Sequence, residues 1–262
     1  MNQSFLYRTP SLVITFVLVV CMVLFFYAGF RIKAKKILEH PGQPDDGFGA
    51  IEGSLLGLLA LLLSFTFSMS SSRHDARIQV MVQEANSIST AIMQADLFPD
   101  SQRSVMRDYF SEYTEARIAQ YNAKNDAVKN KAALDQSDLY LNKLWKMAVA
   151  AAKKEDAVAR NRGNIMMASL NTMSDAVTTR RASRQSTVPD SILILLFLLC
   201  FASSFIAGYG NKKKPDWMVV AGFVLMIALT VFSILDLDRP HRGLISLDSA
   251  EQNYLDLRAL FK

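Results

Sequence analysis

Four stretches of this chain contain no charged residue, and each is about as long as a membrane-crossing helix. They cover residues 11–30, 53–72, 191–210 and 217–235. An α-helix rises about 1.5 Å per residue, so roughly 20 apolar residues are needed to cross the hydrocarbon core of a bilayer. The sequence therefore predicts an all-α polytopic membrane protein, with four transmembrane helices and a helical domain between the second and the third.

For the first stretch, a signal peptide is the alternative to a transmembrane span. Signal peptides carry their positive charges before a shorter apolar core. Here only Arg8 precedes the core, whereas Arg31, Lys33, Lys35 and Lys36 follow it. We therefore interpret the first stretch as a transmembrane span.

The alternation of apolar and polar stretches divides the chain into four predicted segments. In chain order they are a transmembrane hairpin at 1–72 (spans 11–30 and 49–72), an extramembrane helical domain at 73–188, a second transmembrane hairpin at 189–236 (spans 191–210 and 217–236), and a C-terminal tail helix at 237–262. The two hairpins anchor the domain in the lipid bilayer, and we expect the inner membrane as its location.

The helical domain shows helical spacing of apolar residues and no strand-like alternation. The second span is predicted to continue as one helix to Pro99. Three further helices are predicted at about 100–121, after Asp135 or Ser137, and at about 156–182, with a loop at 123–133. Over residues 71–189, 17 Lys and Arg stand against 13 Asp and Glu, a net charge of +4. So small a surplus is typical of a solvated surface, and we expect no nucleic-acid partner.

The second span differs in chemistry from the other three. Gly49, Gly53 and Gly57 recur every fourth residue, which places them on one helix face and predicts close helix packing there. Further along, hydroxyl side chains lie among the apolar ones: Ser64, Thr66, Ser68, Ser70, Ser71 and Ser72. Such hydroxyls either bond to backbone carbonyls and neighbouring helices or line water. Ser64, Ser68 and Ser72 are the candidates for a polar lining.

Charged residues flank this span. Glu52 lies one turn inside it, where it either serves a functional site or simply reaches the membrane interface. Two clusters stand on the domain side: Arg73, Asp75, Arg77 and Glu84 in one, and Asp236, Asp238, Arg239 and Arg242 in the other. We expect Asp–Arg pairing between the clusters to fix how the helices assemble. A cation site at Asp236 and Asp238 is the alternative.

The positive-inside rule gives a preferred orientation. Seven cations lie in the two short loops, at 31–36 and 212–214, whereas three lie near the membrane in the two tails. With the five arginines that flank the domain, the count is seven against eight. If the long domain is left out, the count favours a helical domain outside the cytoplasm.

Motifs for catalysis, cofactors and metals are missing from the sequence. The three His residues, His40, His74 and His241, do not stand at metal-ligand spacing from one another or from Cys21 and Cys200. There is no phosphate-binding glycine loop and no nucleophile elbow. We expect neither an enzyme nor a cofactor or metal site.

The second span, the motif from Ser72 to Arg77, Glu84 with Asn86, and the stretch from Asp236 to Gly243 resemble a bestrophin-like family of bacterial multi-pass membrane proteins. This family is distantly similar to bestrophins, which are pentameric anion channels with a second span that lines the pore and a cytosolic helical domain. The resemblance implies a homo-oligomer, a pentamer by analogy. It also implies a hydrophobic constriction at Leu61, Phe65 and Met69, or at Leu58, Leu62 and Phe65.

We therefore expect an oligomeric ion channel for inorganic ions, with a pore lined by the second span. Glu52 favours cations at one mouth, whereas rings of Arg73 and Arg77 favour anions at the other. The alternative is a non-conducting adaptor or sensor whose helical domain binds a protein partner. An unbroken face of hydroxyl and Phe side chains on the second span favours the channel, and exposed apolar residues within 101–182 favour the adaptor.

Overall fold

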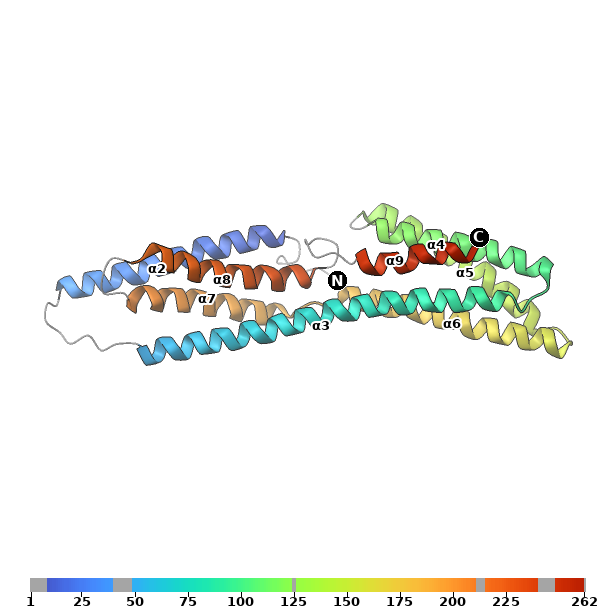
Figure 1. Cartoon of the computed structure of the whole chain (residues 1–262), viewed down its shortest axis with the longest axis horizontal. Coiled ribbons are helices and arrows are strands. Elements are labelled where there is room, and N and C mark those ends of the chain that lie inside the picture. The colour runs from blue at the N-terminus through green and yellow to red at the C-terminus, as the bar shows by residue number, and fades with distance from the viewer. Residues whose placement is uncertain (1–8, 40–48, 124–125, 211–214, 240–247, 262) are drawn as a thin grey trace. The chain divides into compact units, whose positions relative to one another are not determined.

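The computed structural model describes residues 9–39, 49–123, 126–210, 215–239 and 248–261. Its elements are helices α2 (Ser11–Glu39), α3 (Gly49–Ala95), α4 (Asp100–Asn122), α5 (Ala127–Ala152), α6 (Ala157–Gln185), α7 (Asp190–Gly210), α8 (Trp217–Leu237) and α9 (Asp248–Asp256), and the 3-10 helix η1 (Leu257–Phe261) (Figure 1). No strand occurs in the described residues. The predicted all-α membrane fold is confirmed.

Four helical stretches are long and apolar enough to cross a membrane. They are α2, α3, the stretch Ala157–Gly210 and α8. In the third stretch the apolar part is α7, because Ser186 to Pro189 separate it from α6. Pro189 has no N–H to continue a helix, and it precedes the first residue of α7. Asp216 caps α8 by accepting a hydrogen bond from the Met218 N–H at 2.9 Å.

The chain divides into two compact units. The membrane unit comprises Met1–His74 and Thr187–Ile245, and the helical unit comprises Asp75–Ser186 and Ser246–Lys262. Helix α3 belongs to both, since it runs for 47 residues without a break. This continuity confirms the prediction that the second span extends beyond the membrane as one helix.

The membrane unit is held together around α2, which packs against α7 and α8. Met22, Leu196, Cys200 and Val231 lie in its core. Helices α2 and α7 cross with their backbones in contact. A Cβ atom on Gly29 would lie 2.1 Å from the Phe205 carbonyl oxygen. One on Gly208 would lie 2.0 Å from the Phe26 carbonyl oxygen. Only glycine fits at this crossing, as in other close contacts between membrane helices.

The helical unit has a core of large apolar side chains contributed by four helices. Ile88 of α3, Phe110 of α4, Leu144 of α5 and Met166 of α6 are fully buried in it. Tyr254 of α9 and Leu257 of η1 are also buried in this core. The last described residues of the chain therefore belong to the packing of the helical unit.

One boundary differs from the sequence prediction. The segment 123–133 was predicted to be a loop, but α5 already begins at Ala127. Asp126 caps it by accepting hydrogen bonds from the N–H groups of Val128 at 3.0 Å and Lys129 at 3.1 Å. The prediction was wrong because the Asn- and Lys-rich composition was given more weight than this capping aspartate.

Candidate functional site

Helix α3 has two unlike sides within the membrane unit. Leu59, Thr66 and Ser70 are buried on one side. The opposite side, which we term the open face, is formed by Gly53, Gly57, Leu61, Ser64, Phe65, Ser68 and Ser72, all exposed. At 3.6 residues per turn these positions follow one another along the helix. Large apolar side chains stand among them, with Leu61 53% and Phe65 61% exposed.

The three predicted packing glycines begin this face. A Cβ atom on Gly49, Gly53 or Gly57 would have nothing within 4 Å in the part of the chain that the structure describes. No neighbouring helix of the same chain therefore approaches them closely. The predicted close packing at these glycines therefore does not involve the helices that the structure describes in the same chain.

The hydroxyl groups fall into two sets. Thr66 donates to its own helix, at 2.8 Å to the Leu62 carbonyl oxygen and 3.1 Å to that of Leu63. Among the described residues, no hydrogen bond is found for Ser64, Ser68 or Ser72. Unlike Thr66, these three exposed hydroxyls have capacity left for water or for another chain.

Within each of the two predicted constrictions, some residues are exposed and others pack against the same chain. Leu61 and Phe65 belong to the open face, and Leu58 is also exposed, at 51%. Met69 and Leu62 are half-buried and pack against the core of the membrane unit. Leu61 and Phe65 are therefore the members of the first set that project away from the rest of the chain.

The predicted selectivity residues all contact their own chain. The carboxylate of Glu52 lies beside Gly210, the last residue of α7, where a Cβ atom would be 3.1 Å from Oε2. Arg73 donates a hydrogen bond to the Thr187 carbonyl oxygen. Arg77, only 4% exposed, donates to the Ser186 carbonyl oxygen at 2.8 Å. Both guanidinium groups thus bind backbone carbonyls that follow the end of α6, where cations are favourable.

The cluster at the end of α8 is buried and holds the ends of the membrane helices. Asp238 accepts hydrogen bonds from the Val188 N–H at 3.0 and 3.2 Å. Arg239 donates to the Thr9 carbonyl oxygen and, at 3.3 Å, to the Ser11 hydroxyl. Asp236 is 2% exposed.

Besides Glu84, two residues of the predicted assembly cluster remain. Asp75 is exposed, and Arg242 lies outside the described residues. Pairing between the two charged clusters stays a prediction. In the described ranges, no three His, Cys, Asp or Glu side chains form a group that would hold a metal ion.

Glu84, the remaining member of that cluster, is the centre of a buried ion network in the helical unit. Its Oε1 lies 2.6 Å from Nε and 2.5 Å from Nη2 of Arg117, and its Oε2 lies 3.2 Å from Nη1 of Arg180. The Arg180 guanidinium also donates to the Tyr254 hydroxyl at 3.0 Å. The side chains of Glu84, Arg117 and Arg180 are each at most 5% exposed. The network joins α3, α4, α6 and α9.

Electrostatics keeps Glu84 ionised. Burial alone raises the pKa of Glu84, but the charges of Arg117 and Arg180 outweigh it, so the pKa lies below the ordinary value. Burial raises the pKa of Tyr254 well above its ordinary value, so this residue is a neutral hydrogen-bonding partner. The roles of Arg117, Arg180 and Tyr254 in this network were not predicted from the sequence. The local signal for a buried Arg117 is its place directly after Ala116, beside the apolar face of α4 that includes Tyr113.

Known proteins resemble the chain in both sequence and fold. The Bestrophin-like domain family matches residues 48–251. No curated protein is significantly similar in sequence. A crystal structure of a single-site variant of a bacterial bestrophin homologue from Klebsiella pneumoniae is similar with a TM-score of 0.68 and 14% identity, covering 96% of this chain and 99% of the other. A second structure of a bacterial bestrophin homologue from the same organism has a TM-score of 0.64 at 14% identity, covering 93% and 98%.

Proposed function

Because this chain belongs to the Bestrophin-like domain family, we propose that it assembles through α3 into an oligomeric ion channel of the inner membrane. The proposal takes from the bestrophin resemblance a pore surrounded by second spans, one from each subunit, and a pentamer as the expected assembly. The conducted species would be inorganic ions.

One observation carries the proposal, namely the open face of α3. A helix that faced only lipid would not need Gly53 and Gly57 next to unbonded Ser64 and Ser68. Around a central axis, the glycines allow close approach of neighbouring copies, and the serine hydroxyls hydrogen-bond to water. The described part of a single chain supplies neither of these surroundings.

Phe65 and Leu61 form the proposed constriction, with Met69 at its edge. A ring of exposed apolar side chains expels water from a narrow pore and so blocks ions until the ring widens. Glu52 lies near one end of α3, and Arg73 and Arg77 lie further along it. Since both arginines bind carbonyl groups of their own chain, they act on ions through their positive potential and not as free ligands.

Current through reconstituted protein tests this function. Purified oligomer in planar bilayers is expected to conduct, and Phe65→Ala is expected to raise the resting current by widening the constriction. Phe16→Ala is the matched control, because Phe16 on α2 is also strongly exposed, at 70%, and lies on another helix. No current under any ionic condition, together with no leak from Phe65→Ala, would refute the channel.

Orientation needs a separate measurement, because the charge rule and the bestrophin analogy disagree. Val128 of α5 is 80% exposed and is a suitable site for a single cysteine in a background without Cys21 and Cys200. An impermeant thiol reagent that labels Val128→Cys in intact cells would place the helical unit outside the cytoplasm. Labelling only after the cells are opened would support the bestrophin orientation.

The adaptor is the alternative function. Exposed apolar side chains do occur within 101–182, for example Val128 at 80%, Val158 at 56% and Leu139 at 52%. These three come from two different helices, and single exposed apolar residues are common on protein surfaces. An intact oligomer that never conducts would favour this alternative.

A further inference from the structure

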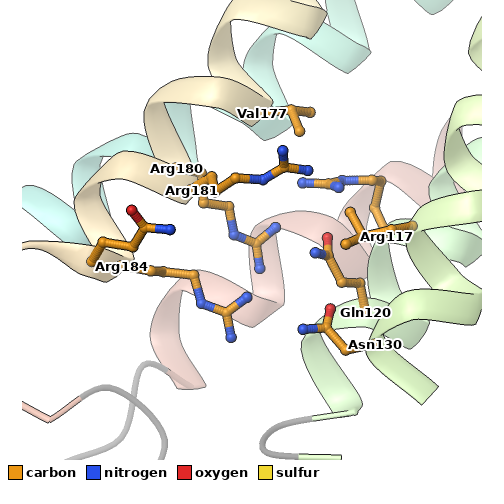
Figure 2. Close-up of a pocket in the computed structure, with 9 residues that line it drawn as sticks. Arg117, Gln120, Asn130, Val177, Arg180, Arg181 and Arg184 are labelled. Carbon is orange, nitrogen blue, oxygen red and sulfur yellow. The ribbon is translucent and has the colours of Figure 1, made fainter. Parts of the chain in front are cut away.

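A second candidate site lies in the helical unit, away from the open face of α3. It is a cavity of about 200 Å³ between α4, α5 and α6. Its polar lining includes Arg117, Gln120, Asn130, Arg180, Arg181 and Arg184. Figure 2 shows the guanidinium groups of Arg181 and Arg184 directed toward the amides of Gln120 and Asn130. We call this cavity the arginine pocket.

The arginine pocket carries an excess of positive charge. Four of its lining side chains are arginines, and none is acidic. Glu84 neutralises part of this charge by pairing with Arg117 and Arg180. Among the described residues, no carboxylate pairs with Arg181 or Arg184. Arginine side chains stay protonated in proteins, so they keep their charge in this crowded arrangement.

Several buried polar atoms of the pocket have no partner within the described ranges. Arg117 is 1% exposed, yet its Nη1 makes no hydrogen bond. The side-chain oxygens of Gln120 and Asn130 are likewise without a donor. Buried polar atoms are normally hydrogen-bonded to protein, water or an ion, so these three atoms have capacity for a partner inside the cavity. Here the donors and acceptors surround one cavity.

The electrostatic state of Arg184 is consistent with a missing anion. Burial, together with the charges of Arg180 and Arg117, lowers the pKa of Arg184 to about 10. An opposite charge in the cavity would reverse this effect. The surroundings of Arg184 therefore favour an anion over a second protein cation or an apolar group.

The size and chemistry of the pocket narrow the ligand. Cofactor and drug sites usually measure about 300–1,000 Å³, so the arginine pocket suits a small anion. Guanidinium groups bind oxyanions through paired N–H donors. The amide oxygens of Gln120 and Asn130 can accept a hydrogen bond from a protonated phosphate oxygen. A fully ionised sulfate has no such hydrogen to donate.

We propose that the arginine pocket binds a phosphate group in a form that keeps one P–OH hydrogen, held by Arg181 and Arg184 from α6 and by Arg117 from α4, with the P–OH donating to the side-chain oxygen of Gln120 or Asn130. The ligand is either inorganic phosphate or the phosphate of a small monoester. The site is independent of the proposed pore, since all of its lining residues belong to the helical unit.

Binding is measured on the full-length protein in detergent, purified without phosphate. Calorimetry and melting curves compare sodium phosphate, glycerol phosphate, sodium sulfate and sodium chloride at equal ionic strength. We expect phosphate to bind saturably and to raise the melting temperature, with sulfate weaker and chloride without effect. If phosphate stabilises the protein no more than chloride does, the proposal is wrong.

Single substitutions test whether phosphate binds in the arginine pocket. Arg181→Gln and Arg184→Gln are each expected to weaken phosphate binding about tenfold or more, because a charge-assisted hydrogen bond is lost. Arg160→Gln is the matched control, since Arg160 is exposed on the same helix and does not line the pocket. Equal weakening by Arg160→Gln would indicate unspecific attraction and overturn the assignment.

Misfolding is excluded by the melting temperature without ligand. Arg184→Gln removes a cation from a crowded positive site, so the unliganded variant is expected to melt no lower than the unsubstituted protein. Glycerol phosphate separates the two sources: binding equal to that of inorganic phosphate favours a monoester, whereas exclusion favours the free ion. Binding of neither overturns the proposal.

Discussion

The two halves of α3 have the same backbone structure and opposite surroundings. In the helical unit, Met81, Ala85, Ile88 and Ile92 are buried at helical spacing. In the membrane unit, Phe65 and its neighbours on the open face are exposed. The chain thus buries the apolar residues of one half of α3 and leaves those on the open face of the other half exposed. In a membrane, such apolar and small residues are covered by lipid or by another protein molecule, and the proposed channel places other copies of α3 against the open face.

The largest effect is expected in the half of α3 that belongs to the helical unit. Glu84→Ala leaves Arg117 and Arg180 buried without their counter-charge, and breaking such a pair costs about 3–5 kcal/mol. The melting temperature in detergent measures the loss. The control is Glu115→Gln, which breaks the half-exposed pair between Glu115 and Arg258 at 2.6 Å; exposed pairs contribute about 0.2–1 kcal/mol. Equal losses for both variants would contradict the buried network.

The next prediction compares two glycines of the membrane unit, one at the crossing of α2 and α7 and one away from it. Gly208→Leu forces a side chain against the backbone of Phe26, and overpacking of this kind costs about 1–3 kcal/mol or more. Gly222→Leu on α8 is the matched control, because a Cβ atom there meets nothing within 4 Å of the described structure. A melting temperature lowered by Gly208→Leu and unchanged by Gly222→Leu is the expected result.

The open face of α3 is tested by a glycine-to-leucine substitution at Gly57. Since no part of the described chain lies within 4 Å of a Cβ atom there, Gly57→Leu is expected to leave the fold of each subunit intact. It should nevertheless weaken assembly, because the added side chain holds neighbouring copies apart. Size-exclusion chromatography with light scattering measures the subunit number. An unchanged oligomer would remove this face from the proposed interface.

The smallest effect concerns acid stability. The pKa of Glu84 is lowered in the folded state, so its stabilising contribution is present above the pKa of the unfolded chain, 4.5. The contribution is lost as the pH falls from there through the folded value. Melting temperatures between pH 7 and pH 3 should therefore fall less for Glu84→Gln than for the unsubstituted protein. Parallel curves would contradict this role of Glu84.

Local sequence signals predicted much of the fold. The apolar stretches predicted the spans, and Pro99 correctly predicted the end of α3, after Ala95. The start of α5 was missed although its signal, Asp126, was present. For the candidate sites the outcome is different. Glu84 was grouped with Arg77 because both lie on α3, whereas its observed partners come from α4 and α6.

The sequence by itself determined the membrane class and the helical content. Both follow from local properties, namely the length of apolar stretches relative to the bilayer and the spacing of apolar residues along a helix. Only the tertiary structure decided which side of α3 stays open, that Gly29 and Gly208 form the close crossing, and that arginines from α4 and α6 surround one pocket. These features depend on residues far apart in the chain, and their proximity is set by the packing of whole helices.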